Sequence, residues 1–256
     1  MLLEASNLTK QYGGVNAVQN FDISVKKGEL VGLIGPNGAG KTTTFNMLSG
    51  YVKPTNGQIL LDGKNINNLP SHKIIKLGLS RTFQGARVFN NLSVLENVFI
   101  ASQLRFEIPP FHSIFRTKKA LKMEAEQLVK CKEVLKRFSL YESKDMIAGD
   151  LPYAHRSLLG IAMAIIQEPK ILLLDEPLAG MNPQETLESV EIIKSLNKKG
   201  LTIIIVEHDI QAIMRLSDKI FVLNYGEKLA EGTPQQIQSN PDVIKAYLGG
   251  DEVVNI

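Results

Sequence analysis

The chain has 256 residues, of which 44% are hydrophobic and 21% are charged. That length is sufficient to bury a sizeable core, and the composition is that of a globular protein. The 29 basic and 26 acidic residues leave a formal net charge of +3. The overall charge therefore gives no reason to expect a nucleic acid as partner.

The sequence also limits where the protein is expected to work. Its single cysteine, Cys131, cannot form an internal disulfide, which fits a reducing cytosol. The longest apolar run, residues 158–166, is shorter than the roughly 20 residues needed to cross a bilayer. The first residues lack the basic start and the apolar stretch of a secretory signal. We therefore expect a cytosolic chain without a transmembrane span.

The N-terminal part is predicted to form strands around one helix. Apolar residues alternate over residues 21–25, which is typical of a half-buried antiparallel strand. Residues 30–34 form a short apolar run that leads into a glycine-rich loop and a helix including residues 43–48. Asp62-Gly63 follows residues 58–61 as the turn of a second hairpin, because both residue types accept positive φ angles.

The middle of the chain is predicted to be helical. Between residues 118 and 138, apolar side chains recur three, four or seven positions apart, which places them on one face of a helix. These side chains are Leu121, Ala125, Leu128, Leu135 and Phe138. Residues 116–137 carry eight basic and three acidic residues. A solvated helix face is the favoured explanation, and a binding surface is the alternative.

Two further buried strands are predicted at residues 171–174 and 202–206. The stretch between them has the length of a helix, with Pro183 near its start and Lys199-Gly200 at its end. Strand, helix and strand in this order favour a parallel sheet with right-handed crossovers. The chain is therefore predicted to have an α/β fold.

A glycine-rich motif separates the predicted strand at 30–34 from the helix that follows. It has the form G-x-x-x-x-G-K-T and consists of Gly35, Pro36, Asn37, Gly38, Ala39, Gly40, Lys41 and Thr42. Backbone N–H groups of such a loop, and the positive end of its helix, bind phosphate oxygens. Lys41 is expected between the β- and γ-phosphates of ATP, and the Thr42 hydroxyl on Mg²⁺. A plain glycine-rich turn is the alternative, which the strand–loop–helix context disfavours.

Two carboxylates, Asp175 and Glu176, follow the predicted strand at 171–174. The carboxyl edge of a parallel sheet is where ligands of open α/β folds bind. Asp175 is predicted to hold Mg²⁺ directly or through water, and Glu176 to polarise the water that attacks the γ-phosphate. The alternative is a pair of acids that stabilise the positive end of a helix. The neighbouring phosphate loop favours the catalytic interpretation.

The order of these motifs resembles the ATP-binding subunit of an ABC transporter over nearly the whole chain. Ser80-Arg81-Thr82-Phe83-Gln84 precedes the Leu-Leu-Leu-Asp-Glu-Pro segment at 172–177, and Glu207-His208-Asp209 follows it. Ala-Gly-Met-Asn-Pro at 179–183 and Leu-Asn-Tyr-Gly-Glu-Lys at 223–228 resemble the ATPases of bacterial branched-chain amino acid importers. The related ATPase of lipopolysaccharide export is the nearest rival.

The resemblance implies a P-loop NTPase fold with ABC ATPase architecture. Its parts are a RecA-like parallel sheet core, an antiparallel β subdomain and a helical insert. A single domain then spans residues 1–256. Residues 1–85 and 166–256 form its nucleotide-binding core, and residues 86–165 form the mostly helical insert.

The resemblance also implies roles for individual residues. Tyr12 stacks on adenine, although on spacing alone an aromatic near a strand end more often serves packing. Thr43 joins the nucleotide contacts. Gln84 reaches Mg²⁺ and the attacking water, and it reports the nucleotide state to a membrane partner. His208 follows the strand at 202–206 and donates a hydrogen bond to the γ-phosphate.

One motif departs from the family. The signature Leu-Ser-Gly-Gly-Gln, which closes over the ATP held by the other subunit, is replaced by Leu-Pro-Tyr-Ala-His at 151–155. The segment expected to face the partner's ATP is Pro152, Tyr153, Ala154 and His155. Pro152 lacks the serine hydroxyl, whereas the N–H groups of Ala154 and His155 can still reach a phosphate if the added Cβ does not block the approach.

The predicted function is ATP hydrolysis that powers amino-acid uptake, with branched-chain amino acids as the favoured solutes. The cofactors are ATP and Mg²⁺, and the location is peripheral, on the cytoplasmic face of the membrane. Implied partners are a membrane permease, a second ATPase subunit in a homo- or heterodimer and, indirectly, a solute-binding protein. The alternatives are a nucleotide-binding switch subunit with weak hydrolysis and an ATPase of lipopolysaccharide export.

Overall fold

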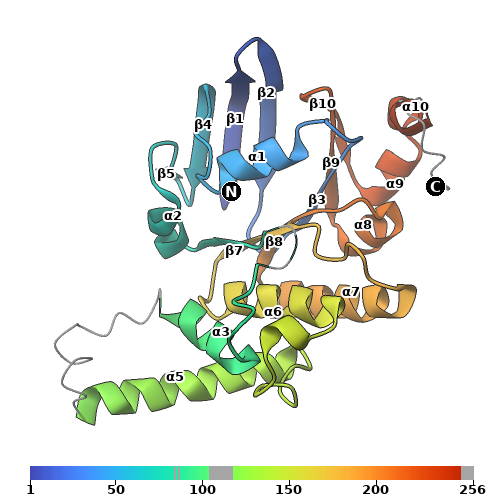
Figure 1. The fold of residues 1–256 in the computed structure, drawn as a ribbon. Coiled ribbons are helices and arrows are strands. Elements are labelled where there is room, and N and C mark those ends of the chain that lie inside the picture. Colours follow the sequence, from blue (N-terminus) through green and yellow to red (C-terminus); the bar gives the residue numbers. More distant parts are fainter. Residues whose placement is uncertain (84, 86, 104–117, 249–256) are drawn as a thin grey trace.

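A six-stranded sheet forms the centre of the molecule (Figure 1). The computed structural model describes residues 1–83, 85, 87–103 and 118–248. The strand order is β10-β9-β3-β8-β7-β6. These strands are β3 (Leu30–Ile34), β6 (Leu79–Arg81), β7 (Ile171–Asp175), β8 (Thr202–Val206), β9 (Lys219–Asn224) and β10 (Glu227–Gly232). Neighbours run parallel except for the antiparallel pair of β9 and β10, so the predicted parallel sheet is confirmed.

Every residue of β3, β7 and β8 is buried. Strands covered on both faces have no solvent side, and for this reason their sequences are continuous apolar runs. Because these three strands are parallel neighbours, their carboxyl ends meet at one edge of the sheet. The chain segments that follow them therefore lie close together, although they are far apart in the sequence.

A four-stranded antiparallel sheet packs on one side of this core, with strand order β2-β1-β4-β5. Its strands are β1 (Leu3–Tyr12), β2 (Val15–Val25), β4 (Asn56–Leu61) and β5 (Lys64–Asn65). The predicted turn at Asp62-Gly63 joins β4 to β5, and both residues have positive φ angles of 50° and 73°. The antiparallel β subdomain is thus confirmed.

The helices cover both faces of the central sheet. They are α1 (Lys41–Leu48), α2 (Ser71–Leu77), α3 (Val94–Ser102), α5 (Lys118–Arg137), α6 (Tyr153–Ile165), α7 (Pro183–Lys198), α8 (Ile210–Leu216), α9 (Pro234–Gln238) and α10 (Pro241–Leu248), with a 3₁₀ turn at Ala148–Asp150. Helix α1 lies between the two sheets, whereas α3, α5 and α6 form a helical layer on the opposite side (Figure 1). These three helices belong to the predicted insert, whose boundaries remain a prediction.

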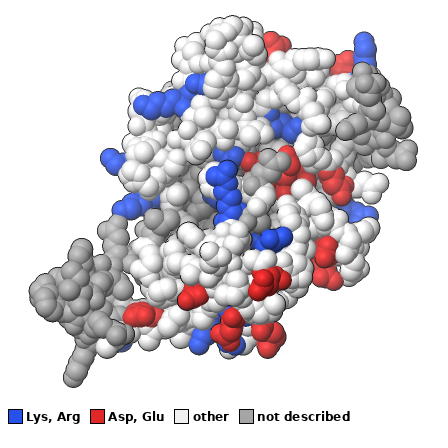
Figure 2. Space-filling view, in the orientation of Figure 1, with Lys and Arg blue, Asp and Glu red and all other residues white. Residues whose placement is uncertain are grey.

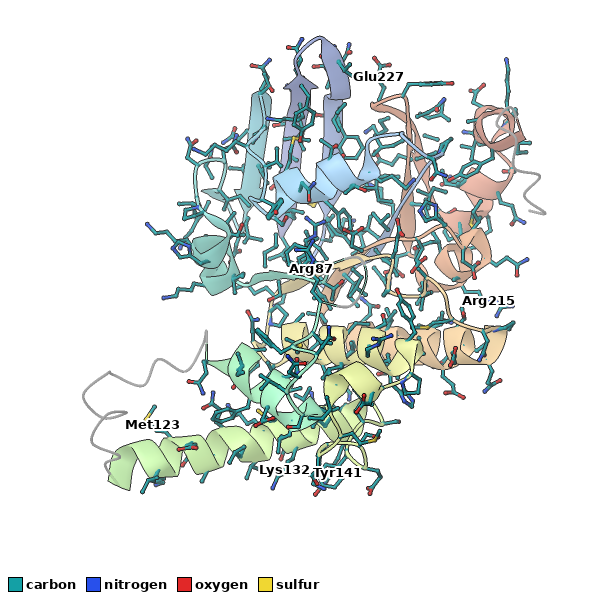
Figure 3. The ribbon with its side chains drawn as sticks, in the orientation of Figure 1. Arg87, Met123, Lys132, Tyr141, Arg215 and Glu227 are labelled. Carbon is teal, nitrogen blue, oxygen red and sulfur yellow. The ribbon has the colours of Figure 1, made fainter. Side chains whose placement is uncertain are left out.

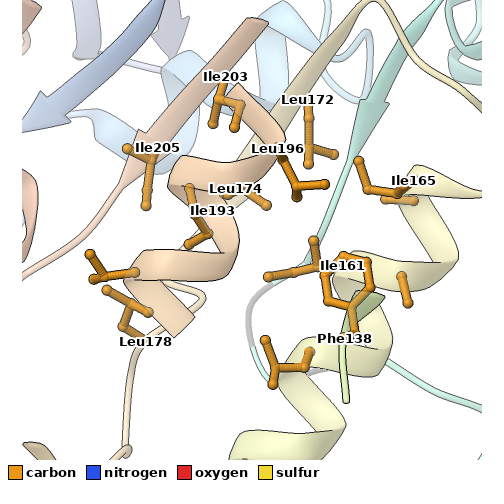
Figure 4. Close-up of a cluster of buried hydrophobic side chains, with 14 of the residues drawn as sticks. Phe138, Ile161, Ile165, Leu172, Leu174, Leu178, Ile193, Leu196, Ile203 and Ile205 are labelled. Atoms are coloured by element: carbon orange, nitrogen blue, oxygen red, sulfur yellow. The ribbon is translucent and has the colours of Figure 1, made fainter. Parts of the chain in front are cut away.

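The helical layer and the central sheet share one hydrophobic core. Side chains from α6 and α7, and Phe138 directly after α5, meet those of β7 and β8 in this cluster (Figure 4). The cluster includes Phe138, Ile161, Ile165, Leu172, Leu174, Ile193, Leu196, Ile203 and Ile205. Continuous packing of this kind fixes the position of α6 relative to the strand ends.

The predicted apolar face of α5 is only partly correct. Leu135 and Phe138 are buried, but Leu121 is 45% exposed and Ala125 is also exposed. The first turns of α5 extend beyond α3 (Figure 1), so this part of the helix has little described structure to pack against. The buried positions nearer the middle of the helix include Gln127 and Cys131, and Gln127 donates to the Ser102 hydroxyl.

Candidate functional site

The loop between β3 and α1 has a backbone shape that requires glycine. A Cβ at Gly35 would stand 2.1 Å from the carbonyl oxygen of Leu223, and one at Gly40 would stand 2.5 Å from that of Ala17. Their φ angles are +154° and +103°, a region that side chains disfavour. Helix α1 has no side-chain cap at its N-terminus. Its first N–H groups are therefore available to an anion.

Lys41, the first residue of α1, points back into this loop. It is only 6% exposed, and its Nζ donates to the carbonyl oxygens of Gly35 at 2.6 Å and Pro36 at 3.1 Å. Burial lowers the pKa of the Lys41 ammonium, and the negative charge of Glu176 partly offsets this shift. The ammonium is thus held at the centre of the loop, where a phosphate would meet it.

A cleft of about 210 Å³ opens beside the loop and joins it to the other strand ends. We call it the phosphate-loop cleft. It is lined by Ala17, Asn37, Gly38, Ala39, Gly40, Lys41, Thr42, Thr43, Glu176 and His208. The sequence motifs that follow β3, β7 and β8 therefore share one cavity.

Glu176 and His208 contact each other across the cleft. The Nε2 atom of His208 lies 2.8 Å from Oε1 of Glu176, whose side chain is 12% exposed. The Glu176 N–H donates to the carbonyl of Val206 at 2.9 Å, so its backbone is tied to the end of β8. Glu176 adopts a positive φ of 49°, which turns the chain sharply after β7. The carboxylate is thereby directed towards the phosphate loop.

Asp175 makes a contact that the sequence motifs did not predict. Its Oδ2 accepts a hydrogen bond from Nη2 of Arg81 at 2.6 Å, and the two side chains are only 4% and 6% exposed. Among the described residues no group of three or more His, Cys, Asp or Glu side chains forms a metal site. The oxygen donors of Asp175 and Thr42 nevertheless suit Mg²⁺, which commonly binds through one or two protein ligands together with phosphates and waters.

Glu207 is a second residue of this region to which the sequence analysis assigned no role. Its side chain is buried, and it accepts the backbone N–H groups of Leu178 at 2.6 Å and His208 at 3.2 Å. Burial raises the pKa of its carboxyl group to about 7, against a lowering by these two hydrogen bonds. The charges of Glu176 and Asp209 raise it further. Its position directly before His208 was the available signal.

We expect the unfolding free energy to depend on pH through Glu207. In the unfolded chain this carboxyl ionises near its ordinary pKa of 4.5, whereas in the folded chain its pKa is about 7. The contribution of Glu207 to stability is therefore complete below pH 4.5 and is lost as pH rises through 7, by about 3 kcal/mol at most. Glu207→Gln, which cannot ionise, should gain that amount relative to wild type between pH 5 and pH 8.

Chemical denaturation of both proteins at the two pH values measures this difference. Glu191→Gln, an exposed change on α7, is the matched control, and its stability difference from wild type should be the same at both pH values. If the stability difference between Glu207→Gln and wild type is the same at pH 5 and pH 8, the proposed protonation of Glu207 is wrong.

One predicted site residue, Tyr12, does not line the phosphate-loop cleft, and another, Gln84, lies outside the described residues. Tyr12 is 49% exposed at the end of β1, with the Lys10 ammonium 5.0 Å from its ring centre, and it is not among the residues that line the phosphate-loop cleft. Its stacking on adenine stays a prediction. Gln84 lies outside the described residues, so its predicted role stays a prediction as well.

The segment that differs from the family signature lies at the start of α6. Pro152 is the N-cap, and no side chain caps this helix end. Tyr153 is 39% exposed and His155 is exposed, whereas Ala154 is buried. The Ser157 hydroxyl donates to the carbonyl of Pro177 at 2.6 Å, which ties α6 to the segment that follows Glu176.

A second, larger hollow of about 470 Å³ lies between the strand ends and the helical layer. Apolar side chains of α3, α6 and the segment after β6 line it, including Phe83, Phe89, Ile100, Ile161 and Met163. Gly160 of α6 also faces it, with open space where a Cβ would stand. Arg87, another lining residue, lies between the central sheet and the helical layer in Figure 3. We call this cavity the inter-lobe hollow, where the two lobes are the central sheet and the helical layer of α3, α5 and α6.

A phosphate loop beside a strand that ends in two carboxylates defines a P-loop nucleoside triphosphatase. A family model described as ABC transporter matches residues 18–179, and one described as branched-chain amino acid ATP-binding cassette transporter matches residues 227–253. The chain therefore belongs to the ABC transporter family, as an ATPase of the ATP-binding cassette type.

Known relatives and solved structures agree with this assignment. The chain is 43% identical over 249 residues to the high-affinity branched-chain amino acid transport ATP-binding protein LivG of Escherichia coli K12, across 97% of this chain and 98% of LivG. It is 32% identical over 248 residues to the lipopolysaccharide export ATP-binding protein LptB of Haemophilus influenzae, across 97% of each chain. A nucleotide-free ATP-binding cassette from an ABC transporter matches with a TM-score of 0.85 at 30% identity, covering 97% of this chain and 99% of that one.

Proposed function

We propose that this chain hydrolyses MgATP to power the uptake of branched-chain amino acids through a separate membrane permease. The meeting of Lys41, Glu176 and His208 in the phosphate-loop cleft carries the ATPase part of the proposal. The solute is inferred from LivG, which is a high-affinity branched-chain amino acid transport ATP-binding protein. The lower identity to LptB disfavours lipopolysaccharide export.

We assign a role to each of the main predicted site residues. Lys41 and the loop N–H groups bind the phosphates, and Thr42, Asp175 and Gln84 hold Mg²⁺, which neutralises charge on the phosphates when it is bound. Glu176 takes the proton of the attacking water, and His208 holds the Glu176 carboxylate and donates to the γ-phosphate. Tyr12 stacks on the adenine.

The inter-lobe hollow is the proposed docking place of the permease. Its apolar lining would accept an apolar helix end of a membrane subunit, and Asp175 and Glu176 are among the residues that line it.

Among the described residues, no helix is both long and apolar enough to cross a membrane. On the face shown in Figure 2 acidic and basic side chains are interspersed. We place the chain at the cytoplasmic face of the membrane, with a solute-binding protein as an indirect partner.

The signature segment at 151–155 favours a heterodimer with a second ATPase. Each ATP of such a dimer lies between one chain's phosphate loop and the other chain's signature. A homodimer of this chain would carry two weakened sites, whereas a heterodimer would carry one site built on Glu176 and a normal partner signature. A subunit that binds ATP but hydrolyses it weakly is the second candidate, because Pro152 has no hydroxyl group.

We expect unequal effects when the catalytic glutamate is changed to glutamine in one subunit at a time. In the transporter assembled with its permease, Glu176→Gln should remove most ATPase activity, and the same change in the partner should remove far less. The measurement is phosphate release by the purified transporter in lipid. Equal losses, or full activity from a homodimer of this chain, would contradict the asymmetry, and low activity of every assembly would favour the weak-hydrolysis candidate.

A further inference from the structure

The function proposed above assigns no role to the ion pair between Arg81 and Asp175. It joins the last residue of β6 to the last residue of β7, with 2.6 Å between Nη2 and Oδ2. Both side chains are almost completely buried, at 6% and 4% exposure. The metal-binding carboxylate that we propose is therefore already paired with a fixed positive charge of the same chain.

Arg81 is held in place by α1 as well as by Asp175. Its Nη1 donates to Oδ1 of Asn46 at 2.7 Å and to the Ser49 hydroxyl at 3.0 Å. The guanidinium also lies over the rings of Phe45 and Phe83, at 5.7 and 5.1 Å from their centres. These contacts position the guanidinium beside Asp175 before any ligand binds.

A carboxylate buried to this extent needs a cation, and two cations at one carboxylate repel each other. Mg²⁺ at Asp175 would therefore meet the charge of Arg81 at short range. We propose that Arg81 is the resident counter-ion of Asp175 and competes with Mg²⁺ for it, so that this pair sets the metal affinity of the nucleotide site. This inference rests on the proposed role of Asp175 as a metal ligand.

A purely orienting role for Arg81 predicts the opposite result. If the guanidinium only held the Asp175 carboxylate in its binding position, its removal would loosen that carboxylate and weaken metal binding. Competition predicts tighter binding of the metal once the guanidinium is gone. The sign of the change in metal affinity thus separates the two roles.

The test is Arg81→Gln, with Mn²⁺ titrated as a spectroscopic substitute for Mg²⁺ into ATP-loaded protein and followed by electron paramagnetic resonance. We expect the metal affinity to rise by about tenfold, with ATP affinity in EDTA unchanged. The melting temperature of this variant should also increase more than that of wild type when Mg²⁺ is added, because the metal replaces the missing counter-ion.

Three further variants make the result specific. Arg81→Lys retains the positive charge and should raise the metal affinity less than Arg81→Gln does. Asn46→Ala removes one of the two hydrogen bonds that Nη1 of Arg81 donates to α1, and it should raise the metal affinity slightly. It therefore tests the proposal even if Arg81→Gln does not fold. Arg215→Gln changes an exposed arginine of α8 that does not line the phosphate-loop cleft, and is the matched control.

Unchanged or weaker metal binding in folded Arg81→Gln would overturn the proposal. So would a weaker affinity in Asn46→Ala, or an equal rise in Arg81→Lys and Arg81→Gln. A wild-type protein that binds ATP in EDTA but shows no metal binding would instead refute the proposed Mg²⁺ site itself. Failure of this inference and failure of the proposed function therefore give different results.

Discussion

Replacing Glu176 with glutamine should lower the rate of ATP hydrolysis by about 100-fold or more and leave ATP binding intact. Glutamine has the same shape and can still contact His208 across the 2.8 Å distance seen here, but it cannot accept a proton from water at neutral pH. Glutamine also adopts the backbone conformation of this position as readily as glutamate does, so the variant should fold. The loss therefore reports the removal of a base.

The measurement is single-turnover ATP hydrolysis by the assembled transporter, with nucleotide affinity determined in parallel. The matched control is Glu191→Gln, which changes an exposed glutamate of α7 that pairs with Lys194 at 3.7 Å. A surface pair of this kind contributes little, so that variant should hydrolyse ATP normally. A Glu176→Gln protein with near-normal turnover would rule out Glu176 as the base.

Replacing Lys41 with alanine should weaken the affinity for MgATP by about 10- to 100-fold. A charge-assisted hydrogen bond to a phosphate is worth about 1.5–3 kcal/mol, and alanine cannot make it. The two hydrogen bonds of Lys41 to the carbonyls of Gly35 and Pro36 are also lost. The hydrophobic clusters do not include Lys41, so the fold should remain intact.

Nucleotide titration by calorimetry measures the affinity, and circular dichroism shows whether the variant is folded. Lys122→Ala is the matched control, because Lys122 is an exposed lysine of α5 and does not line the phosphate-loop cleft. An unchanged dissociation constant in folded Lys41→Ala would remove the basis for assigning Gly35 to Thr42 as the phosphate-binding loop.

Much of the fold was predictable because its determinants are local in sequence. The apolar runs at 30–34, 171–174 and 202–206 indicated buried strands, and each one is a central strand of the parallel sheet. Parallel strands end at a common edge, so the grouping of Lys41, Glu176 and His208 followed from the strands alone. The helix α5 was also predictable, and so was part of its buried face, but not how far along the helix this face would be covered. That depends on where α3 ends.

Local pattern thus determined the phosphate loop, the strand-end carboxylates and the α/β class, because glycine spacing and apolar periodicity act over a few neighbouring residues. Only the tertiary structure decided that Asp175 pairs with Arg81, 94 positions away, and that the Glu207 carboxyl is buried against the N–H of Leu178. Both contacts depend on which strands become neighbours in the sheet. The pKa of a carboxyl and its counter-ion are set by that three-dimensional surrounding, which no short stretch of sequence specifies.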